Sequence, residues 1–441
     1  MANTSLTRTS GTSTNVDKCT FSAWVKRGTL GALSPMFSAG SSGQSQVVFT
    51  ASDELAVYDG GTVILKTNRK FRDPNAWYHI VVTLDATQSG TDKAKLYVNG
   101  VQETSFATDG RSSFSSLAKA NQSGEVQDIG SDGSGNFLGA MTHVHMTDNY
   151  AYQASTFGET DSTTNIWVPK TSPSVTYGTN GFFLKFENAG NLDLDSSPNN
   201  LTFATSGTLT QDTDSPTNNV CVMNGVGNRA YGFTFANANT SVTYSSGDWE
   251  SIQGSIGASA GKWYYETKWN GSGAYMAGWT SSNFMDNSPV NYVGHTYAEP
   301  SYAIQASDGG IYYSTSSSHT QDSASWGDTF TSSDILGCAI DIDNGKIYWS
   351  KNGTWMNSGV PTSGSTGTGA FNIADTATNY FWQPVMSSYN GAQGMFNFGS
   401  GYFGTTQVSS ANADANGHGA FEYAVPSGYY ALNTKNLKEF G

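Results

Sequence analysis

Positive charge is scarce in this sequence. Its 441 residues include 21 Lys and Arg against 35 Asp and Glu, which gives a formal net charge of −14 at pH 7. No cluster of basic residues stands out, and a nucleic-acid groove needs such a cluster to neutralise phosphates. We therefore expect no nucleic-acid partner.

Cysteine is also scarce. The chain has three, Cys19, Cys221 and Cys338, each in a different region. An odd number at wide spacing implies neither a disulfide framework nor a metal knuckle. We expect reduced, buried thiols, because a free cysteine usually behaves as a small buried apolar residue.

Long apolar runs are missing. No stretch approaches the roughly 20 apolar residues of a membrane-spanning helix. The opening Met-Ala-Asn-Thr-Ser has neither the basic nor the apolar region of a secretory signal. We expect a soluble chain with no membrane contact.

Aromatic residues and glycine are abundant instead. The chain has 11 Trp, 23 Tyr, 23 Phe and 50 Gly, whereas no convincing stretch places apolar residues at the helical spacing of 3.6. Large rings supply core area that aliphatic side chains supply elsewhere. The length favours two or three domains. The sequence therefore predicts an all-β protein.

The first region contains four strand-like segments in a recognisable order. They are "TFSAWVKR", "WYHIVVTLDAT", "AKLYVNGVQ" and "NFLGAMTHVHM". In the third, Asn99-Gly100 is the pair that favours a type I′ hairpin turn. This order resembles the laminin-G-like, concanavalin A-like jelly roll. The resemblance implies that fold, and binding of glycans or proteins through its rim.

Residues 231–403 resemble a SPRY domain. The segments that carry the resemblance are "GKWYYETKW" at 261–269, "AGWT" at 277–280 and the hairpin within 327–355, "GDTFTSSDILGCAIDIDNGKIYWSKNGTW". The strand pattern predicts buried rings at Trp263, Trp269, Trp279 and Trp349. The resemblance implies a second sandwich that binds partners through the loops at one end. We therefore expect an all-β chain of two consecutive antiparallel β-sandwiches.

Residues 191–230 predict a packed connector, because turn formers dominate while Leu201 and Phe203 can still pack on a neighbour. The stretches "NIWVPKTSPSVTYGTNGFFLKFEN" and "DTDSPTNNVCVMN" resemble recurring parts of tailed-bacteriophage structural proteins. Residues 404–441, with "VPSGYYALN", resemble the ends of such proteins and predict a C-terminal arm. The expected domains are therefore 1–190, the connector 191–230, 231–403 and the arm 404–441.

The catalytic patterns of this fold are not found in the sequence. Retaining glycosidases of the concanavalin A-like fold use Glu-x-Asp-x-Glu, whereas the glutamates here stand isolated. No Gly-x-Ser-x-Gly elbow sits between a strand and a helix. His143 and His145 alternate on one strand without a third zinc ligand nearby. We expect no enzymatic activity. A polysaccharide-degrading enzyme with carboxylates from distant loops stays open as an alternative.

We expect no cofactor, and a structural calcium ion stays open as an alternative. Asp193, Asp195, Ser197 and Asn199 carry oxygen atoms at alternating positions, as calcium-binding loops do. Turn-forming side chains explain the same run without an ion.

Aromatic residues in Gly-, Ser- and Asn-rich segments are the candidate binding residues. Rings in loops serve sugar stacking and protein interfaces alike, although packing is the commoner role. The candidates are Trp249, Phe284, Tyr292, Tyr297, Trp326 and Trp355.

Together these features predict a phage virion component, such as a tail fibre, spike or head appendage. It would attach to other virion proteins and recognise a polysaccharide or protein on the host surface. The high aromatic content favours self-association, and phage fibres are commonly trimers, so we expect a homotrimer. A capsid decoration protein without host contact stays open as a further alternative.

Overall fold

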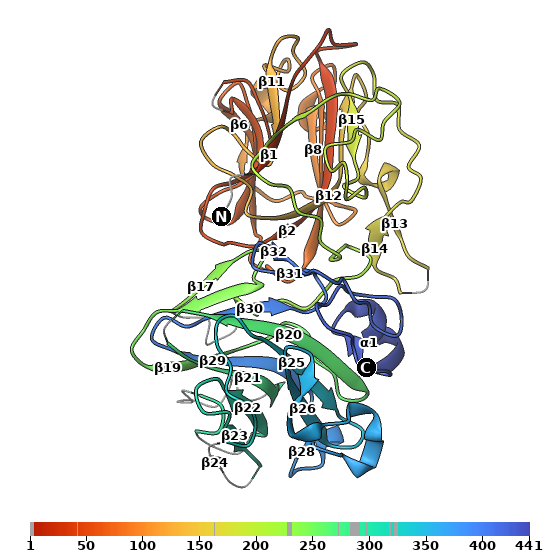
Figure 1. Ribbon diagram of the computed structural model, residues 1–441. Helices are drawn as coiled ribbons and strands as arrows, with labels where there is room; N and C mark the ends of the chain where they lie inside the picture. Colours follow the sequence, from red (N-terminus) through yellow and green to blue (C-terminus); the bar gives the residue numbers. More distant parts are fainter. Residues whose placement is uncertain are drawn as a thin grey trace. The chain divides into compact units, whose positions relative to one another are not determined.

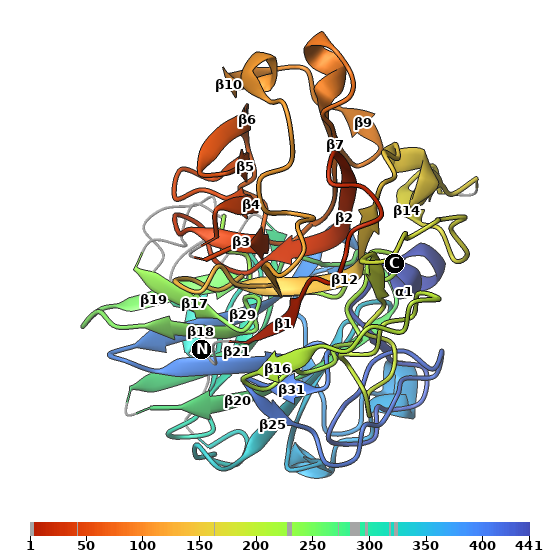
Figure 2. The same cartoon turned by 90° about the horizontal axis from the view of Figure 1, so that it is seen from above.

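The computed structural model describes residues 4–41, 43–162, 164–226, 232–271, 273–282, 292–295, 299–316, 319–321 and 325–441. The chain divides into two compact units, unit 1 (Met1–Gln211) and unit 2 (Asp212–Gly441). This division falls inside the segment 191–230 that we expected to connect two domains. Each unit is built on two antiparallel sheets (Figures 1 and 2), so the predicted pair of consecutive β-sandwiches is confirmed.

Unit 1 pairs an eight-stranded sheet (sheet 1) with a six-stranded sheet (sheet 2) in its described part. Sheet 1 has the order β10 (Phe106–Asp109), β6 (Thr62–Lys70), β5 (Glu54–Asp59), β4 (Ser45–Phe49), β3 (Ser34–Ala39), β11 (Val126–Ile129), β1 (Ser5–Thr9) and β16 (Ala204–Ser206). Sheet 2 has the order β15 (Phe182–Leu184), β12 (Gly139–Asp148), β2 (Lys18–Arg27), β7 (Trp77–Asp85), β8 (Ala94–Val98) and β9 (Val101–Gln102). Short 3-10 turns occur at η1 (Gly90–Lys93), η2 (Arg111–Ser113) and η3 (Ala154–Thr156).

The alternation of β2 explains how sheet 2 meets sheet 1. Phe21, Ala23 and Val25 are buried in the core between the two sheets, whereas Trp24 points to the other face and stacks on His79 at 4.7 Å. This is the pattern that a period of two requires. The hairpin from β8 to β9 turns at Asn99 (φ 48°) and Gly100 (φ 83°), which confirms the expected two-residue turn.

The outer face of sheet 2 is covered by residues of unit 1 itself. A hairpin of β13 (Gly158–Thr160) and β14 (Trp167–Pro169) contributes Trp167, and the turn before it contributes Phe157. Both rings pack with Val81 and Tyr97 of the sheet. This face is therefore an internal layer of the sandwich, with little surface left for a ligand.

Unit 2 also has two main sheets in its described part. Sheet 3 has the order β17 (Phe233–Ala236), β18 (Ser241–Tyr244), β30 (Gln393–Asn397), β20 (Lys262–Asn270), β25 (Ile335–Asp341), β26 (Lys346–Lys351) and β27 (Thr354–Trp355), with β28 (Phe371–Asn372) on β26 and β33 (Tyr430–Ala431) on β20. Sheet 4 has the order β19 (Trp249–Gln253), β29 (Trp382–Tyr389), β21 (Ala274–Ser281), β22 (Ser301–Gln305), β23 (Ile311–Ser314) and β24 (His319–Gln321). The remaining elements are the pair β31 (Tyr402–Phe403) and β32 (Thr406–Gln407), the 3-10 turns η5 (Met356–Ser358), η6 (Pro361–Thr366) and η7 (Ala377–Asn379), and the helix α1 (Thr434–Phe440).

The core of unit 2 is rich in aromatic rings, as expected. Trp263, Trp279 and Trp349 are fully buried between sheets 3 and 4, and Trp269 packs against the same core while partly exposed. The diagnostic hairpin joins β25 to β26. Asp341 pairs with Lys346 across it, so four residues make the turn and the expected Asn-Gly pair is its second half.

The C-terminal arm lies on the outer face of sheet 3. Its residues Phe421, Tyr429 and Ala431 form one buried cluster with Tyr264 and Tyr348 of the sheet. The arm ends in α1, whose Phe440 stacks on Tyr430 of β33 with ring centroids 3.8 Å apart. The arm is thus an integral layer of unit 2 (Figure 1).

The three cysteines are free and buried, as predicted. Burial raises the pKa of the Cys19 and Cys338 thiols, which makes both poor nucleophiles. Among the described residues, no helix is long and apolar enough to cross a membrane.

Candidate binding sites

Two of the six aromatic candidates, Phe284 and Tyr297, lie outside the described residues. The other four are all partly buried, and they fall into two different environments.

Trp249 and Tyr292 come together on sheet 4, although they are distant in sequence. Their ring centroids lie 5.2 Å apart, and the Trp249 ring lies 5.7 Å from Tyr389, its partner across β19 and β29. Tyr292 also contacts His295 at 4.6 Å. We call Trp249, Tyr292, His295 and Tyr389 the sheet 4 aromatic cluster. Each of the four remains partly exposed, so the cluster presents rings to solvent.

The segment that carries Tyr292 is fastened to the face of sheet 4. The amide of the buried Val293 donates a hydrogen bond to Ser387 Oγ at 3.0 Å, and Ser387 Oγ lies 2.8 Å from Ser251 Oγ. Val293 packs with Met276 and Val385. This anchor holds Tyr292 beside Trp249. The sequence interpretation missed Tyr389, whose signal was its place at the end of a strand before Asn390-Gly391.

Trp326 and Trp355 do not share a surface. The Trp326 ring lies 5.6 Å from Trp349, on the core side of sheet 3, whereas the Trp355 ring lies 6.3 Å from Tyr348, on the outer side. Neighbouring residues of a strand point to opposite faces. The two segments do meet, because Asn357 Nδ2 donates to the Trp326 carbonyl at 2.7 Å. The two loops therefore lie close together, whereas the two rings lie on opposite faces of sheet 3.

The run from Asp193 to Asn199 is held by hydrogen bonds of its own. Asp195 Oδ1 accepts from the amides of Phe183 (2.9 Å) and Ser197 (2.8 Å). Its Oδ2 accepts from Ser197 Oγ (2.9 Å) and the amide of Leu201 (2.8 Å). The side-chain amide of Asn199 donates to the carbonyls of Gly178 and Gly181, and Asp193 contacts Thr205. These bonds fasten the chain to β15 and account for the run without an ion.

Within the described ranges, no group of three or more His, Cys, Asp or Glu is arranged to hold a metal ion. His143 lies in a bulge of β12 with φ 49°, and burial lowers the pKa of this histidine to about 4. His145 is fully buried against Phe183, with Nδ1 2.9 Å from Tyr177 Oη. The two histidines are therefore packing residues of sheet 2.

Ser22 and His79 form a buried pair whose geometry disfavours nucleophilic chemistry. Trp167 Nε1 donates to His79 Nδ1 at 2.9 Å, which places the ring proton on Nε2, 2.9 Å from Ser22 Oγ. His79 therefore donates to the serine and cannot accept its proton. Burial lowers the pKa of His79 to about 3, so the neutral form persists.

Glu266 is a buried carboxylate beneath the C-terminal arm. It accepts hydrogen bonds from the amides of Glu422 (2.9 Å) and Tyr423 (2.8 Å) of the arm and from Tyr264 Oη (3.1 Å). Burial raises the pKa of Glu266 to about 7, and these hydrogen bonds oppose that change only in part. Glu266 therefore links the arm to sheet 3 and couples that contact to pH.

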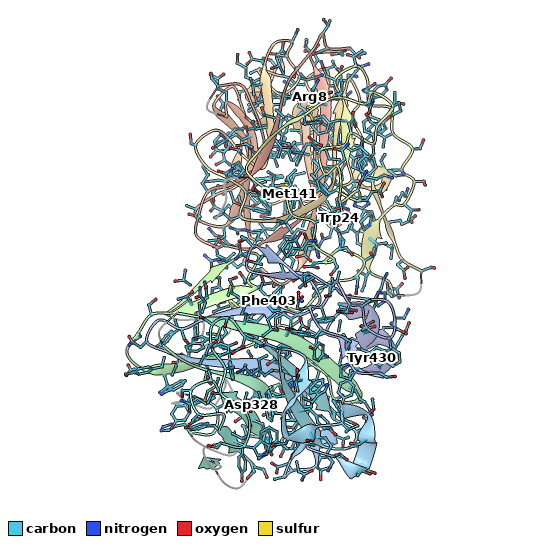
Figure 3. All side chains as sticks on the ribbon, viewed as in Figure 1. Arg8, Trp24, Met141, Asp328, Phe403 and Tyr430 are labelled. Atoms are coloured by element: carbon cyan, nitrogen blue, oxygen red, sulfur yellow. The ribbon has the colours of Figure 1, made fainter. Side chains whose placement is uncertain are left out.

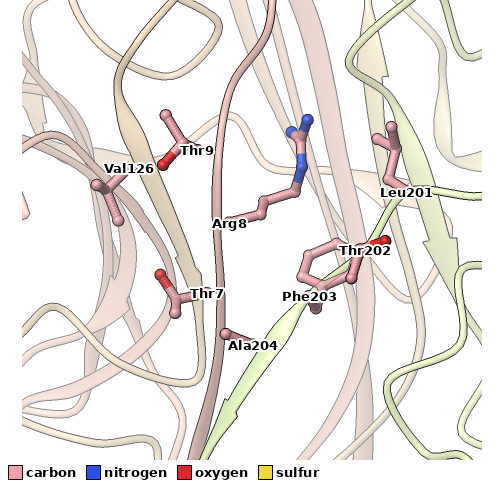
Figure 4. A pocket seen from close by; sticks show the side chains of 8 residues that line it. All are labelled: Thr7, Arg8, Thr9, Val126, Leu201, Thr202, Phe203 and Ala204. Atoms are coloured by element: carbon pink, nitrogen blue, oxygen red, sulfur yellow. The ribbon is translucent and has the colours of Figure 1, made fainter.

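A pocket of about 520 Å³ in unit 1 contains Arg8 of β1 (Figures 3 and 4). It opens where β1 and the segment before β16 separate, because the pairing of these strands ends at Thr7 and Ala204. Leu201, Phe203 and Val126 supply apolar wall. We call this the Arg8 pocket. The sequence interpretation did not identify it, since no motif marks it.

Two models of known families match this chain, one in each unit. Residues 2–155 match the Laminin_G_3 model, described as the concanavalin A-like lectin/glucanases superfamily. Residues 262–401 match the SPRY domain model. Each match covers less than half of the chain, and the two follow one another in the order of the units.

Solved structures show low similarity. The SPRY domain of human HERC1 is 18% identical, with a TM-score of 0.26 over 35% of this chain and 86% of that one. The TRIM65 PSpry domain is 13% identical, with a TM-score of 0.28 over 40% and 89%. A candidate carbohydrate-binding protein from Bacteroides ovatus is 16% identical, with a TM-score of 0.35 over 47% and 57%. These similarities are too weak to indicate the function of this chain.

The two family matches agree with the order of the sequence motifs and with the paired antiparallel sheets of each unit. The chain therefore consists of a laminin-G-type, concanavalin A-like domain followed by a SPRY domain.

Proposed function

We propose that this chain is a non-enzymatic binding protein of a bacteriophage particle, and that it recognises a glycan on the host surface through the sheet 4 aromatic cluster. The observation that carries the proposal is the meeting of Trp249, Tyr292 and Tyr389, three partly exposed rings from separate segments. Aromatic rings with one apolar face and a polar rim favour both sugars and protein partners.

The surroundings of the cluster support a preorganised binding surface. The rings of Trp249 and Tyr292 rest on a buried layer that includes Met276, Val293 and Val385. The contact between Ser251 and Ser387 joins the underlying strands β19 and β29. A ring held in place loses little conformational freedom when a ligand binds. The resemblance of residues 165–188 and 212–224 to tailed-phage structural proteins supports the virion part of the proposal.

A cell-binding assay tests the recognition. Labelled protein should bind host cells, and a double variant Trp249→Ala, Tyr389→Ala should bind at least tenfold more weakly, as variants of central aromatic contacts do. Trp355→Ala is the matched control, because Trp355 is also partly buried but lies on sheet 3. Equal binding by the double variant, at an unchanged melting temperature, would exclude the cluster.

Chemical treatment of the cells separates the kinds of ligand. Periodate oxidation of the host surface should abolish binding, whereas protease treatment should not. Loss of binding after protease treatment alone would replace the glycan with a protein receptor. Release of reducing ends from host polysaccharide by the purified chain would overturn the non-enzymatic part and favour the glycosidase alternative.

Immunogold electron microscopy tests the virion assignment. An antibody against the chain should label phage particles purified from a lysate. Particles without label would contradict it. Label on the head combined with no binding to host cells would favour the capsid decoration alternative.

A further inference from the structure

Arg8 has unused hydrogen-bonding capacity in the Arg8 pocket. A guanidinium has five N–H donors. Nη1 donates to Gln127 Oε1 at 2.6 Å and to the Asn180 carbonyl at 3.3 Å, and Nη2 donates to Asn180 Oδ1 at 3.4 Å. Three donors are thus engaged. Among the residues that the structure describes, the Nε–H and the second Nη2–H have no partner.

These two donors have the geometry of an anion clamp. N–H groups on Nε and on one Nη are adjacent and parallel, and such a pair binds both oxygens of a carboxylate. The other three bonds hold the guanidinium in place, so the clamp is preorganised. Burial lowers the pKa of Arg8 and the negative charge of Asp195 raises it, yet arginine keeps its charge at neutral pH.

The carboxylate whose charge acts on Arg8 is engaged elsewhere. Asp195 acts on Arg8 through its charge, but its two oxygens already accept four hydrogen bonds from Phe183, Ser197 and Leu201. A ligand carboxylate would therefore find free donors in a chain whose net charge is −14. Arg8 is the cationic residue among those that line the pocket (Figure 4).

The other walls of the Arg8 pocket fit a saccharide. Thr9 and Thr202 are exposed, and no described residue hydrogen-bonds to their hydroxyls, which leaves them for sugar hydroxyls. Leu201 and the 43% exposed Val126 offer apolar contact. The volume of about 520 Å³ lies in the range of small-ligand pockets, whereas a protein partner needs a far larger area.

We propose that the Arg8 pocket binds an acidic saccharide through the carboxylate of a uronic acid, with Arg8 as the clamp and the threonine hydroxyls on the sugar. The proposal deepens the proposed function, on which it rests for the presence of a glycan ligand. It adds a second binding site, which lies on unit 1. This site requires a negatively charged ligand, whereas the aromatic cluster does not.

Calorimetric titration of the full chain with trigalacturonic acid tests the clamp. We expect saturable binding that weakens with salt. The trimethyl ester of the same trisaccharide keeps the sugar rings and loses the charge, so it should bind at least tenfold more weakly. Equal affinity for acid and ester would overturn the proposal, and so would equal affinity for a tri-glutamate peptide, which would make the ligand class acidic peptide.

Variants separate the clamp from charge and folding. Arg8→Lys keeps the charge but removes the paired donors, and Arg8→Gln removes both. Both should bind trigalacturonic acid at least tenfold more weakly, with melting temperatures measured alongside. Lys170→Gln removes a cation of unit 1 outside the pocket and should bind as the parent does. Parent-like binding by Arg8→Lys would contradict the clamp.

The same variants separate this proposal from the proposed function. If trigalacturonic acid does not bind while host cells are still bound through the aromatic cluster, the clamp is wrong and the proposed function stands. If trigalacturonic acid binds while the chain ignores host cells, the clamp stands without the proposed function.

Discussion

Trp249 and Tyr389 face each other across β19 and β29, with ring centroids 5.7 Å apart, at the end of a sheet whose remaining face is largely buried. This pair gives unit 2 an aromatic surface, to which the described segment 292–295 adds the Tyr292 ring. Trp326 and Trp355 differ from this pair, because each packs on a buried ring of β26.

Trp326 and Trp355 should behave as packing residues. Each contacts a buried ring of β26, on opposite faces of sheet 3. We expect Trp326→Ala and Trp355→Ala each to lower the free energy of unfolding by about 2 kcal/mol, less than the roughly 3–5 kcal/mol of a fully buried tryptophan. Urea unfolding measures this. A double variant that melts like the parent would return both rings to the list of binding candidates.

Glu266 should make unit 2 less stable at alkaline pH. The folded protein binds the proton more tightly than the unfolded chain, because burial raises the pKa of Glu266 to about 7 from 4.5. The contribution is complete below pH 4.5 and is lost as pH rises through 7. This contribution to the free energy of unfolding amounts to about 3 kcal/mol.

Glu266→Gln removes this titration. Between pH 4.5 and 8 the free energy of unfolding of the parent should fall by about 3 kcal/mol more than that of the variant. Glu187→Gln alters an exposed carboxylate and should follow the parent. Parallel pH curves for the parent and Glu266→Gln would show that the arm is not coupled to pH at this residue.

Asp195 should stabilise unit 1 without calcium. Asp195→Asn replaces one accepting oxygen with an NH2 group, which would face backbone N–H donors. We therefore expect the free energy of unfolding to fall by about 2–3 kcal/mol. Thermal unfolding with about 1 mM calcium and with a chelator should give the same melting temperature for the parent. A calcium-dependent rise in the parent that Asp195→Asn lacks would instead support the predicted calcium site.

Self-association stays a prediction. We expect a homotrimer, so light scattering at micromolar concentration should give three times the chain mass of 46.8 kDa. A mass equal to one chain, without any partner present, would contradict it.

The strands were predictable because a period of two is a local property of the chain. The alternation around Phe21 and Val25, and the Asn99-Gly100 turn, followed from the side chains alone. The buried rings Trp263 and Trp349 followed in the same way, since a bulky ring inside a strand pattern usually lies in the core.

The candidate sites depended on which segments meet, and local pattern does not carry that information. Trp326 and Trp355 flank one hairpin, but their rings pack on Trp349 and Tyr348 respectively. These two neighbours in β26 point to opposite faces of sheet 3. Trp249 gained its partner Tyr389 from the register of β19 with β29. Arg8 became a clamp because Gln127 and Asn180, distant in sequence, each engage part of its guanidinium. The sequence thus determined the strands and the fold class, whereas tertiary pairing alone decided which side chains keep free donors or exposed faces.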